Sequence, residues 1–289
     1  MELVLGIYKI EQLNKYIGYI DAAILMSKGL ALVYEDLDLD LAIEACLKNK
    51  VKPIIAINKI FQPSDINAAR IAINKYKDNP NIYFYASDIG ICNIALENKI
   101  ESRFIFNPET MITNYKDLEI YNGFGFDALA MSNEITLEDL IKAYDLTKAS
   151  LFYLGFGHRL MFYSKRKLIS LYSKKNNSSY LADNMYLRES TRNDFLPIIE
   201  NENGTMIYRS YLISLIDNLD NLEFLKYLYL DPLYIDEASF YEAVKCFRAV
   251  IENEISSNAA LEILDNLGLD IKDGFKYQDS VYQKEELKR

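Results

Sequence analysis

Carboxylate side chains that could do acid–base chemistry follow several short apolar runs in this sequence. Glu109, Glu134 and Asp231 each come within a few residues of the end of such a run. Carboxyl groups that meet at one site can act as general acid and general base, or bind a cation. Alternatively, each caps the helix that follows it, because acidic side chains are favoured in first turns. Both interpretations stay open at this point. If the three converge, Glu109 and Glu134 are the catalytic candidates and Asp231 is a ligand-binding one.

The single histidine, His158, is a third catalytic candidate. It follows Gly155 and Gly157, which allow the backbone to approach a ligand closely. The alternative is a structural or surface histidine. One histidine excludes a two-histidine metal site, and neither a Ser–His–Asp arrangement nor a nucleophile elbow is present. A conventional serine or cysteine protease is therefore disfavoured.

A basic cluster spans residues 164–167, with the sequence Ser-Lys-Arg-Lys. It opens a segment, 163–175, that we expect to be helical. Ser164, Lys165 and Arg166 could hold a phosphate or a carboxylate at the start of this helix. The alternative is a solvated helix face without a ligand.

The cysteine pattern disfavours a metal centre built by this chain alone. Cys46, Cys92 and Cys246 are far apart in the sequence and form no CxxC pair. An odd number of cysteines also argues against a disulfide framework. We expect core thiols, no metal and no cofactor that the residues alone make evident.

Composition and charge bound the class of protein. The net charge of -10 argues against strong autonomous RNA binding, although a local basic patch or a basic partner stays open. The beginning of the sequence lacks the pattern of a signal peptide, and no apolar run is long enough to span a membrane. We therefore expect a cytoplasmic protein without membrane contact.

Short apolar runs alternate with amphipathic stretches along the sequence. These continuous runs are typical of strands buried on both faces. Eight are predicted as strands: Leu3–Ile7, Ala22–Met26, Pro53–Asn58, Ile82–Ala86, Arg103–Phe106, Asp127–Met131, Ser150–Leu154 and Tyr227–Leu230. Helical patterns separate them, and Thr136 and Ser64-Asp65 mark two helix starts.

This alternation favours an α/β protein with a (β/α)₈ barrel of the TIM type, in a regular or a distorted form. Such barrels carry their chemistry at the carboxyl ends of the strands, where the polar residues gather. A doubly wound open sheet is the alternative, but no GxGxxG or Walker-type loop follows a strand. The interval between strands seven and eight is too long for one helix, so we expect an insertion at about 174–213. The barrel would occupy 1–255, and a helix and tail 256–289.

Five segments, in order along the chain, carry motifs that can be compared with known families. The segments are Asn107–Tyr115, Met131–Glu138, Phe162–Tyr172, Arg192–Ser210 and 273–282. They resemble motifs of the U32 family of collagenase-like peptidases, and the resemblance covers nearly the whole chain and implies the barrel fold. Relatives are known as peptidases or as factors in hydroxylation, including prephenate-dependent hydroxylation of the tRNA wobble uridine.

The resemblance also implies a set of site residues. Glu109, Asn114, Glu134, Ser164, Arg166 and Arg192 would line a pocket for a small carboxylate or a base. Arg166 and Arg192 are the favoured anion contacts, because an arginine presents a bidentate fork. The candidate ligand-binding residues are then Asn114, Ser164, Lys165, Arg166, Arg192 and Asp231.

One departure from the family pattern shapes the expected role. Longer relatives hold a [4Fe-4S] cluster, but two of their cysteine positions fall at Leu160-Met161 and Lys167 here. The resemblance therefore implies a partner of a longer U32 paralogue in hydroxylation, with prephenate as co-substrate and tRNA reached through that paralogue. A collagenase-like peptidase and a non-catalytic scaffold subunit are the alternatives.

Overall fold

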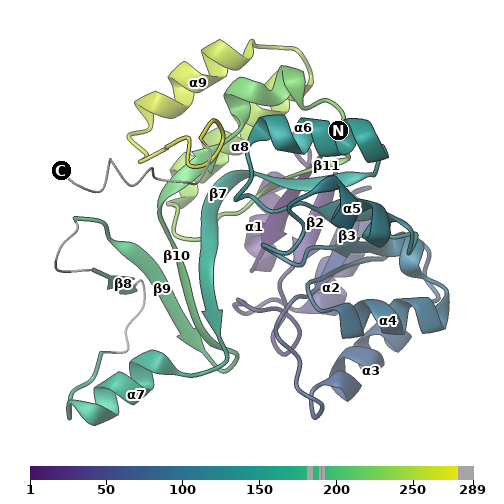
Figure 1. Cartoon of the computed structure of the whole chain (residues 1–289), viewed down its shortest axis with the longest axis vertical. Helices are drawn as coiled ribbons and strands as arrows, with labels where there is room; N and C mark the ends of the chain where they lie inside the picture. Colours follow the sequence, from purple (N-terminus) through teal and green to yellow (C-terminus); the bar gives the residue numbers. More distant parts are fainter. Residues whose placement is uncertain (181–184, 189, 191–192, 279–289) are drawn as a thin grey trace.

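The computed structural model describes residues 1–180, 185–188, 190 and 193–278. Eight parallel strands form a closed barrel, because β11 pairs with both β1 and β7 (Figure 1). The strands are β1 (Glu2–Ile7), β2 (Ala22–Leu25), β3 (Lys52–Ile57), β4 (Tyr83–Ala86), β5 (Phe104–Phe106), β6 (Ala128–Ala130), β7 (Leu151–Ser164) and β11 (Tyr227–Leu230). The predicted (β/α)₈ barrel and its eight strands are confirmed.

Alternate residues of each strand enter two separate cores. Val4, Ile24 and Ile54 belong to the apolar cluster inside the barrel. The next residue of each strand, Leu5, Leu25 or Ile55, packs outward against the helices. Because both faces of each strand are buried, the runs in the sequence are continuously apolar rather than alternating.

Helices surround the barrel and begin at the caps that the sequence supplies. The Thr136 hydroxyl accepts a hydrogen bond from the Asp139 amide, as predicted, whereas Asp65 makes no side-chain cap. Asp65 instead binds Lys165. The helices are α1 (Ile10–Tyr16), α2 (Leu39–Lys48), α3 (Ile66–Tyr76), α4 (Ile89–Asn98), α5 (Tyr115–Asn122), α6 (Leu137–Thr147), α8 (Glu237–Ile251) and α9 (Ser257–Asn266), with 3₁₀ turns η1 (Glu101–Arg103) and η2 (Ile216–Asn221). No helix in the described ranges is long and apolar enough to cross a membrane.

An arm projects from the barrel between β7 and β11. It consists of the outer part of β7, α7 (Leu168–Lys175), β8 (Met185–Leu187), β9 (Leu196–Asn201) and the paired part of β10 (Gly204–Ser214). These strands pair antiparallel, and Figure 1 shows the arm at the left with α7 at its lower end. The helix expected from residue 163 begins only at Leu168, because Tyr163 and Ser164 pair with Met206 and Thr205.

The amino-terminal end of the barrel is closed by a polar network. The Tyr227 hydroxyl donates to the Asp127 carboxylate at 2.7 Å and accepts from Lys52 Nζ at 2.9 Å. Lys226 pairs with the same aspartate at 2.7 Å. Lys52 also pairs with Glu2 at 2.7 Å. These contacts join β1, β3 and β11, so this end contributes stability rather than an open site.

Candidate functional site

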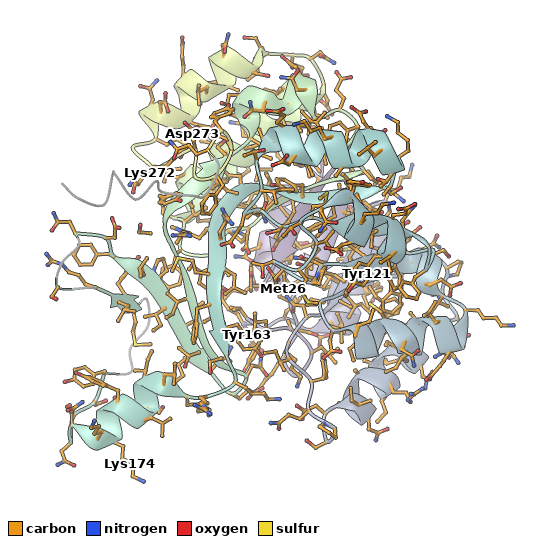
Figure 2. The ribbon with its side chains drawn as sticks, in the orientation of Figure 1. Met26, Tyr121, Tyr163, Lys174, Lys272 and Asp273 are labelled. Atoms are coloured by element: carbon orange, nitrogen blue, oxygen red, sulfur yellow. The ribbon has the colours of Figure 1, made fainter. Side chains whose placement is uncertain are left out.

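A cavity of about 90 Å³ opens at the carboxyl ends of the barrel strands. Its wall combines loops that follow the strands with residues of β7 and β10 at the base of the arm. Met26, which Figure 2 labels at the end of β2, contributes to the apolar part of the wall. The polar residues of the wall are Tyr8, Asn58, Tyr85, Asn107, Glu109, Thr110, Asn133, Tyr153, His158, Arg159, Tyr208, Tyr229 and Asp231.

Glu109 enters this cavity from a tight turn after β5. The Asn107 amide continues the sheet by donating to the Ala86 carbonyl at 2.9 Å. The Asn107 side-chain oxygen then accepts from the Glu109 amide at 3.0 Å, and Glu109 adopts a left-handed φ of 57°. This turn directs a half-buried carboxyl into the cavity. Burial, followed by the nearby charge of Asp231, raises the pKa of Glu109 to about 7.

Asp231 enters the same cavity directly after β11. Its carboxylate accepts from the Tyr8 hydroxyl and from the Leu233 amide, each at 3.1 Å. The Tyr229 hydroxyl also hydrogen bonds to it. Burial raises the pKa of Asp231 to about 6, and these hydrogen bonds oppose the increase because they favour the ionised form. Glu109 and Asp231 thus both titrate near neutral pH.

Gly157, which precedes His158, allows two backbone segments to lie close together. Gly157 has a φ of +141°, and a Cβ there would lie 3.0 Å from the Asp231 carbonyl oxygen. Glycine therefore allows β7 to lie against the start of the loop that carries Asp231. The glycine thus serves a close approach of two strand ends, and the expected approach of the backbone to a ligand stays a prediction.

Four tyrosines surround the two carboxyl groups. Tyr8, Tyr85, Tyr208 and Tyr229 are buried, and burial raises the pKa of each hydroxyl well above 10. They therefore remain neutral and can donate hydrogen bonds to a polar ligand. The Tyr85 hydroxyl already accepts from the Asn107 side-chain amide.

Arg159 is the only lysine or arginine among the described residues that line the cavity. Its side chain is 6% exposed, and its guanidinium lies 3.5 Å from a Glu134 carboxylate oxygen. The guanidinium also lies over the Phe275 ring at 5.0 Å. Asn133, beside it in the wall, has a buried side-chain oxygen without a hydrogen-bond partner. This corner of the cavity can receive an anionic or hydrogen-bond-donating group of a ligand.

His158 lines the cavity and connects β7 to β10. Its Nδ1 lies 2.8 Å from the Arg209 carbonyl oxygen. Because a carbonyl only accepts, Nδ1 carries the proton of this hydrogen bond. Burial lowers the pKa of the imidazole, so the neutral form is favoured.

The other predicted site residues lie away from the cavity wall. Glu134 contacts it indirectly, through Arg159. Asn114 caps α5 by accepting from the Lys116 and Asp117 amides. Ser164 accepts from the Arg166 amide at the end of β7, and Lys165 pairs with Asp65 at 2.8 Å. Arg166 is exposed at the start of the arm helix, and Arg192 lies outside the described residues. Their proposed ligand-binding roles stay predictions.

The predicted site lacked several polar residues of the wall, among them Arg159, Tyr8, Tyr85, Tyr208 and Tyr229. Tyr85 and Tyr229 occupy inward positions of predicted strands, so the two-residue period of a strand could have placed them inside the barrel. Arg159 and Tyr208 could not be placed, because the extension of β7 and its pairing with β10 were not predicted. Tyr8 lies just beyond β1.

The three cysteines do not approach one another. Cys46, Cys92 and Cys246 are buried on α2, α4 and α8. Burial raises the pKa of each thiol, to about 12 for Cys46. Within the described ranges, no group of three His, Cys, Asp or Glu residues could hold a metal ion. The described residues therefore do not fit a [4Fe-4S] cluster.

Comparisons with known proteins agree with the sequence motifs. The family model of peptidase family U32 matches residues 31–280. The tRNA hydroxylation protein P2 of Bacillus subtilis (strain 168) is 24% identical over 196 residues, covering 64% of this chain and 62% of that protein. The match thus spans less than two thirds of that relative. A crystal structure of the 3-dehydroquinate dehydratase from Aquifex aeolicus VF5 is 15% identical with a TM-score of 0.37, over 53% of this chain and 77% of that one.

Proposed function

Because the chain belongs to peptidase family U32, we propose that it acts in the hydroxylation of tRNA. The observation that carries the proposal is its similarity to a protein named for tRNA hydroxylation. The position that we propose is the wobble uridine. We further propose that prephenate serves as co-substrate and that a longer paralogue of the same family works with this chain.

The cavity supports a small organic acid as ligand. Arg159 would pair with a carboxylate of prephenate, because a buried guanidinium binds carboxylates through charged hydrogen bonds. The hydroxyls of Tyr8, Tyr85, Tyr208 and Tyr229 would donate to the remaining oxygens. An anion would also gain from protonation of Glu109, which its raised pKa makes accessible at neutral pH.

The two carboxyl groups would divide the proton transfers between them. Asp231, with the lower pKa of about 6, would be largely ionised at pH 7 and would accept a proton. Glu109, with a pKa of about 7, would be available in both forms. Tyr8 would hold the Asp231 carboxylate in position. Glu134 would position Arg159, and His158 would hold β10 against the cavity.

The proposed proton transfers in this chain do not use the [4Fe-4S] cluster that longer relatives hold. The described cysteines are buried on three separate helices, so no step is assigned to a cluster in this chain. Iron–sulfur chemistry, if the reaction uses it, would come from the longer paralogue.

Mass spectrometry of bulk tRNA tests the proposal. A strain that lacks this gene should lose 5-hydroxyuridine derivatives, and the wild-type gene should restore them. Asp231→Asn should fail to restore them, whereas Asp36→Asn, an exposed loop variant, should succeed. Unchanged hydroxyuridine levels in the deletion strain would refute the proposal. Restoration by every cavity variant would instead indicate a scaffold.

Peptide hydrolysis is the second candidate, and the carboxyl pair is the observation that favours it. Two neighbouring carboxyls with pKa values of about 7 and 6 can activate water and protonate a leaving group. Purified protein should then cleave gelatin, and both Glu109→Gln and Asp231→Asn should lower the rate. No cleavage across a range of added divalent metals would exclude this candidate.

A further inference from the structure

The arm concentrates positive charge in an otherwise acidic chain. Between Phe162 and Ala182 the sequence has five Lys and Arg residues and no Asp or Glu, whereas the whole chain has a net charge of -10. Arg166, Lys167, Lys174 and Lys175 are exposed. Figure 2 shows Lys174 on α7, far from the barrel helices. The distribution of charge therefore marks this surface as one that attracts an anionic partner.

The same segment exposes aromatic rings that a helix would ordinarily bury. Tyr172 on α7 is 58% exposed, and Tyr180, just beyond the helix, is 48% exposed. Their ring centroids lie 5.3 Å apart. Leu171 is also exposed, and Ser173 is the only buried residue of α7. Two adjacent lysines between two exposed tyrosines suit a single-stranded nucleic acid, whose phosphates pair with the cations and whose bases stack on the rings.

The structure holds α7 firmly in this exposed position. The Glu200 carboxylate accepts from the Ile169 amide at 2.6 Å and from the Ser170 amide at 3.1 Å. The Thr205 hydroxyl accepts from the Leu168 amide at 2.9 Å. These contacts cap the start of α7 from the β9–β10 hairpin, so the helix is presented on a fixed support.

The hairpin is in turn anchored to the loops at the barrel mouth. Asn203 donates to the carbonyls of Ala31 and Leu32, at 2.9 and 3.0 Å. Lys165 pairs with Asp65 across the same junction. β7 continues from Leu160, which lines the cavity, to Ser164, a span of about 14 Å at ~3.4 Å per residue. The cavity and the base of α7 are therefore separated by a short, paired stretch of strand.

We propose that the outer surface of α7 and the residues up to Tyr180 bind a single-stranded segment of RNA on the arm. The choice of RNA over other polyanions rests on the proposed function in tRNA hydroxylation. Lys174 and Lys175 contact phosphates, and Tyr172 stacks on a base. A protein partner is disfavoured, because a partner surface would have to match both the exposed rings and a run of cations without a single acid.

Fluorescence anisotropy with the full-length protein tests this inference. The probe is a fluorescein-labelled RNA stem-loop with uridine in its loop, compared with the same RNA annealed to its complement. Lys174→Ala/Lys175→Ala should weaken binding of the stem-loop about tenfold and reduce the salt slope by about 1.4, since each phosphate contact in a single strand contributes ~0.7. Tyr172→Ala should weaken it by at least about fivefold.

The matched control is Lys48→Ala/Lys50→Ala, which removes two exposed lysines at the end of α2. It should bind RNA like the wild type, and all variants should show the wild-type Tm. Wild-type affinity of both arm variants, or equal affinity for stem-loop and annealed duplex, overturns the inference. The inference is also overturned if the arm variants abolish a dimer in size-exclusion chromatography while RNA binding is unchanged. The surface would then bind a second copy of this chain.

The binding experiment is independent of tRNA hydroxylation in cells. Loss of RNA binding by the arm variants supports the inference even if the deletion strain keeps its hydroxyuridine. Conversely, the deletion strain could lack hydroxyuridine while both arm variants restore it fully and bind RNA like the wild type. That result would overturn the role of the arm and leave the proposed function standing.

Discussion

The charge of Asp231 reaches Glu109 across the barrel mouth and adds to the effect of burial on the pKa of Glu109. Their strands, β11 and β5, are separated in the closed sheet by β6 and β7. The resulting pKa values of about 7 for Glu109 and about 6 for Asp231 allow one group to be protonated while the other is ionised. Such an arrangement lets two carboxyls take opposite parts in proton transfer.

Glu109→Gln should stabilise the fold at high pH. The pKa of Glu109 is about 7 in the folded protein against 4.5 for an ordinary glutamate, so folding takes up a proton between these values. The wild type therefore loses stability as pH rises from 4.5 through 7, and the amide does not. At pH 8 the variant should gain on the order of 1–3 kcal/mol in free energy of unfolding.

Urea unfolding at pH 8 and at pH 4 measures this difference. At pH 4 the gain should vanish, because Glu109 is then protonated in both states. Glu44→Gln, an exposed variant on α2, is the control and should change stability at neither pH. A loss of stability at pH 8 would contradict the burial of the charge.

Tyr8→Phe should raise the pKa of Asp231 above about 6. The Tyr8 hydroxyl donates to the carboxylate at 3.1 Å and so stabilises its ionised form. Removal of that donor favours the protonated form. Carboxyl ¹³C chemical shifts across a pH titration report the change directly. Tyr163→Phe, whose hydroxyl lies outside the cavity wall, should leave the titration of Asp231 unchanged.

Arg159→Lys should weaken the binding of prephenate about tenfold, because lysine lacks the bidentate fork of arginine. Isothermal titration calorimetry with purified protein measures the Kd. Arg70→Lys is the matched control, since Arg70 forms an exposed ion pair with Glu97 on the outer helices. Equal affinities of wild type and Arg159→Lys would show that Arg159 does not hold the ligand.

The affinity for prephenate should fall as pH rises from 6 to 8. Glu109 and Asp231 lose their protons in this range, and each new negative charge repels a carboxylate ligand. The Glu109→Gln variant should show a shallower decrease. Calorimetry at several pH values checks both slopes, and an affinity that increases with pH would rule out an anionic ligand in this cavity.

Tyr227→Phe should destabilise the protein by about 1–2 kcal/mol, since Asp127 and Lys52 would lose a shared hydrogen-bond partner. Because this network lies at the amino-terminal end of the barrel, the Kd for prephenate should not change. Urea unfolding and calorimetry separate the two effects. Tyr115→Phe, an exposed variant, should alter neither quantity.

The sequence was sufficient to predict the barrel, because strands buried on both faces give continuous apolar runs. It was also sufficient to predict that Glu109 and Asp231 follow the carboxyl ends of their strands, where both line the cavity. It was insufficient for Arg159, whose position depends on pairing between β7 and residues about fifty positions later in the chain. Asn114 has the residue type of both a ligand contact and a helix cap, and only the structure shows that it caps α5.

Closure of the barrel has a consequence for synthesis on the ribosome. β11 pairs with β1 and β7, so the edges of both strands lack their barrel partner until residue 230 has been made. The β9–β10 hairpin, in contrast, contains only local pairings and precedes β11 in the chain. The nascent chain can therefore form its hairpin while the parallel sheet is still open, and the unpaired edges of β1 and β7 are exposed to aggregation in this interval.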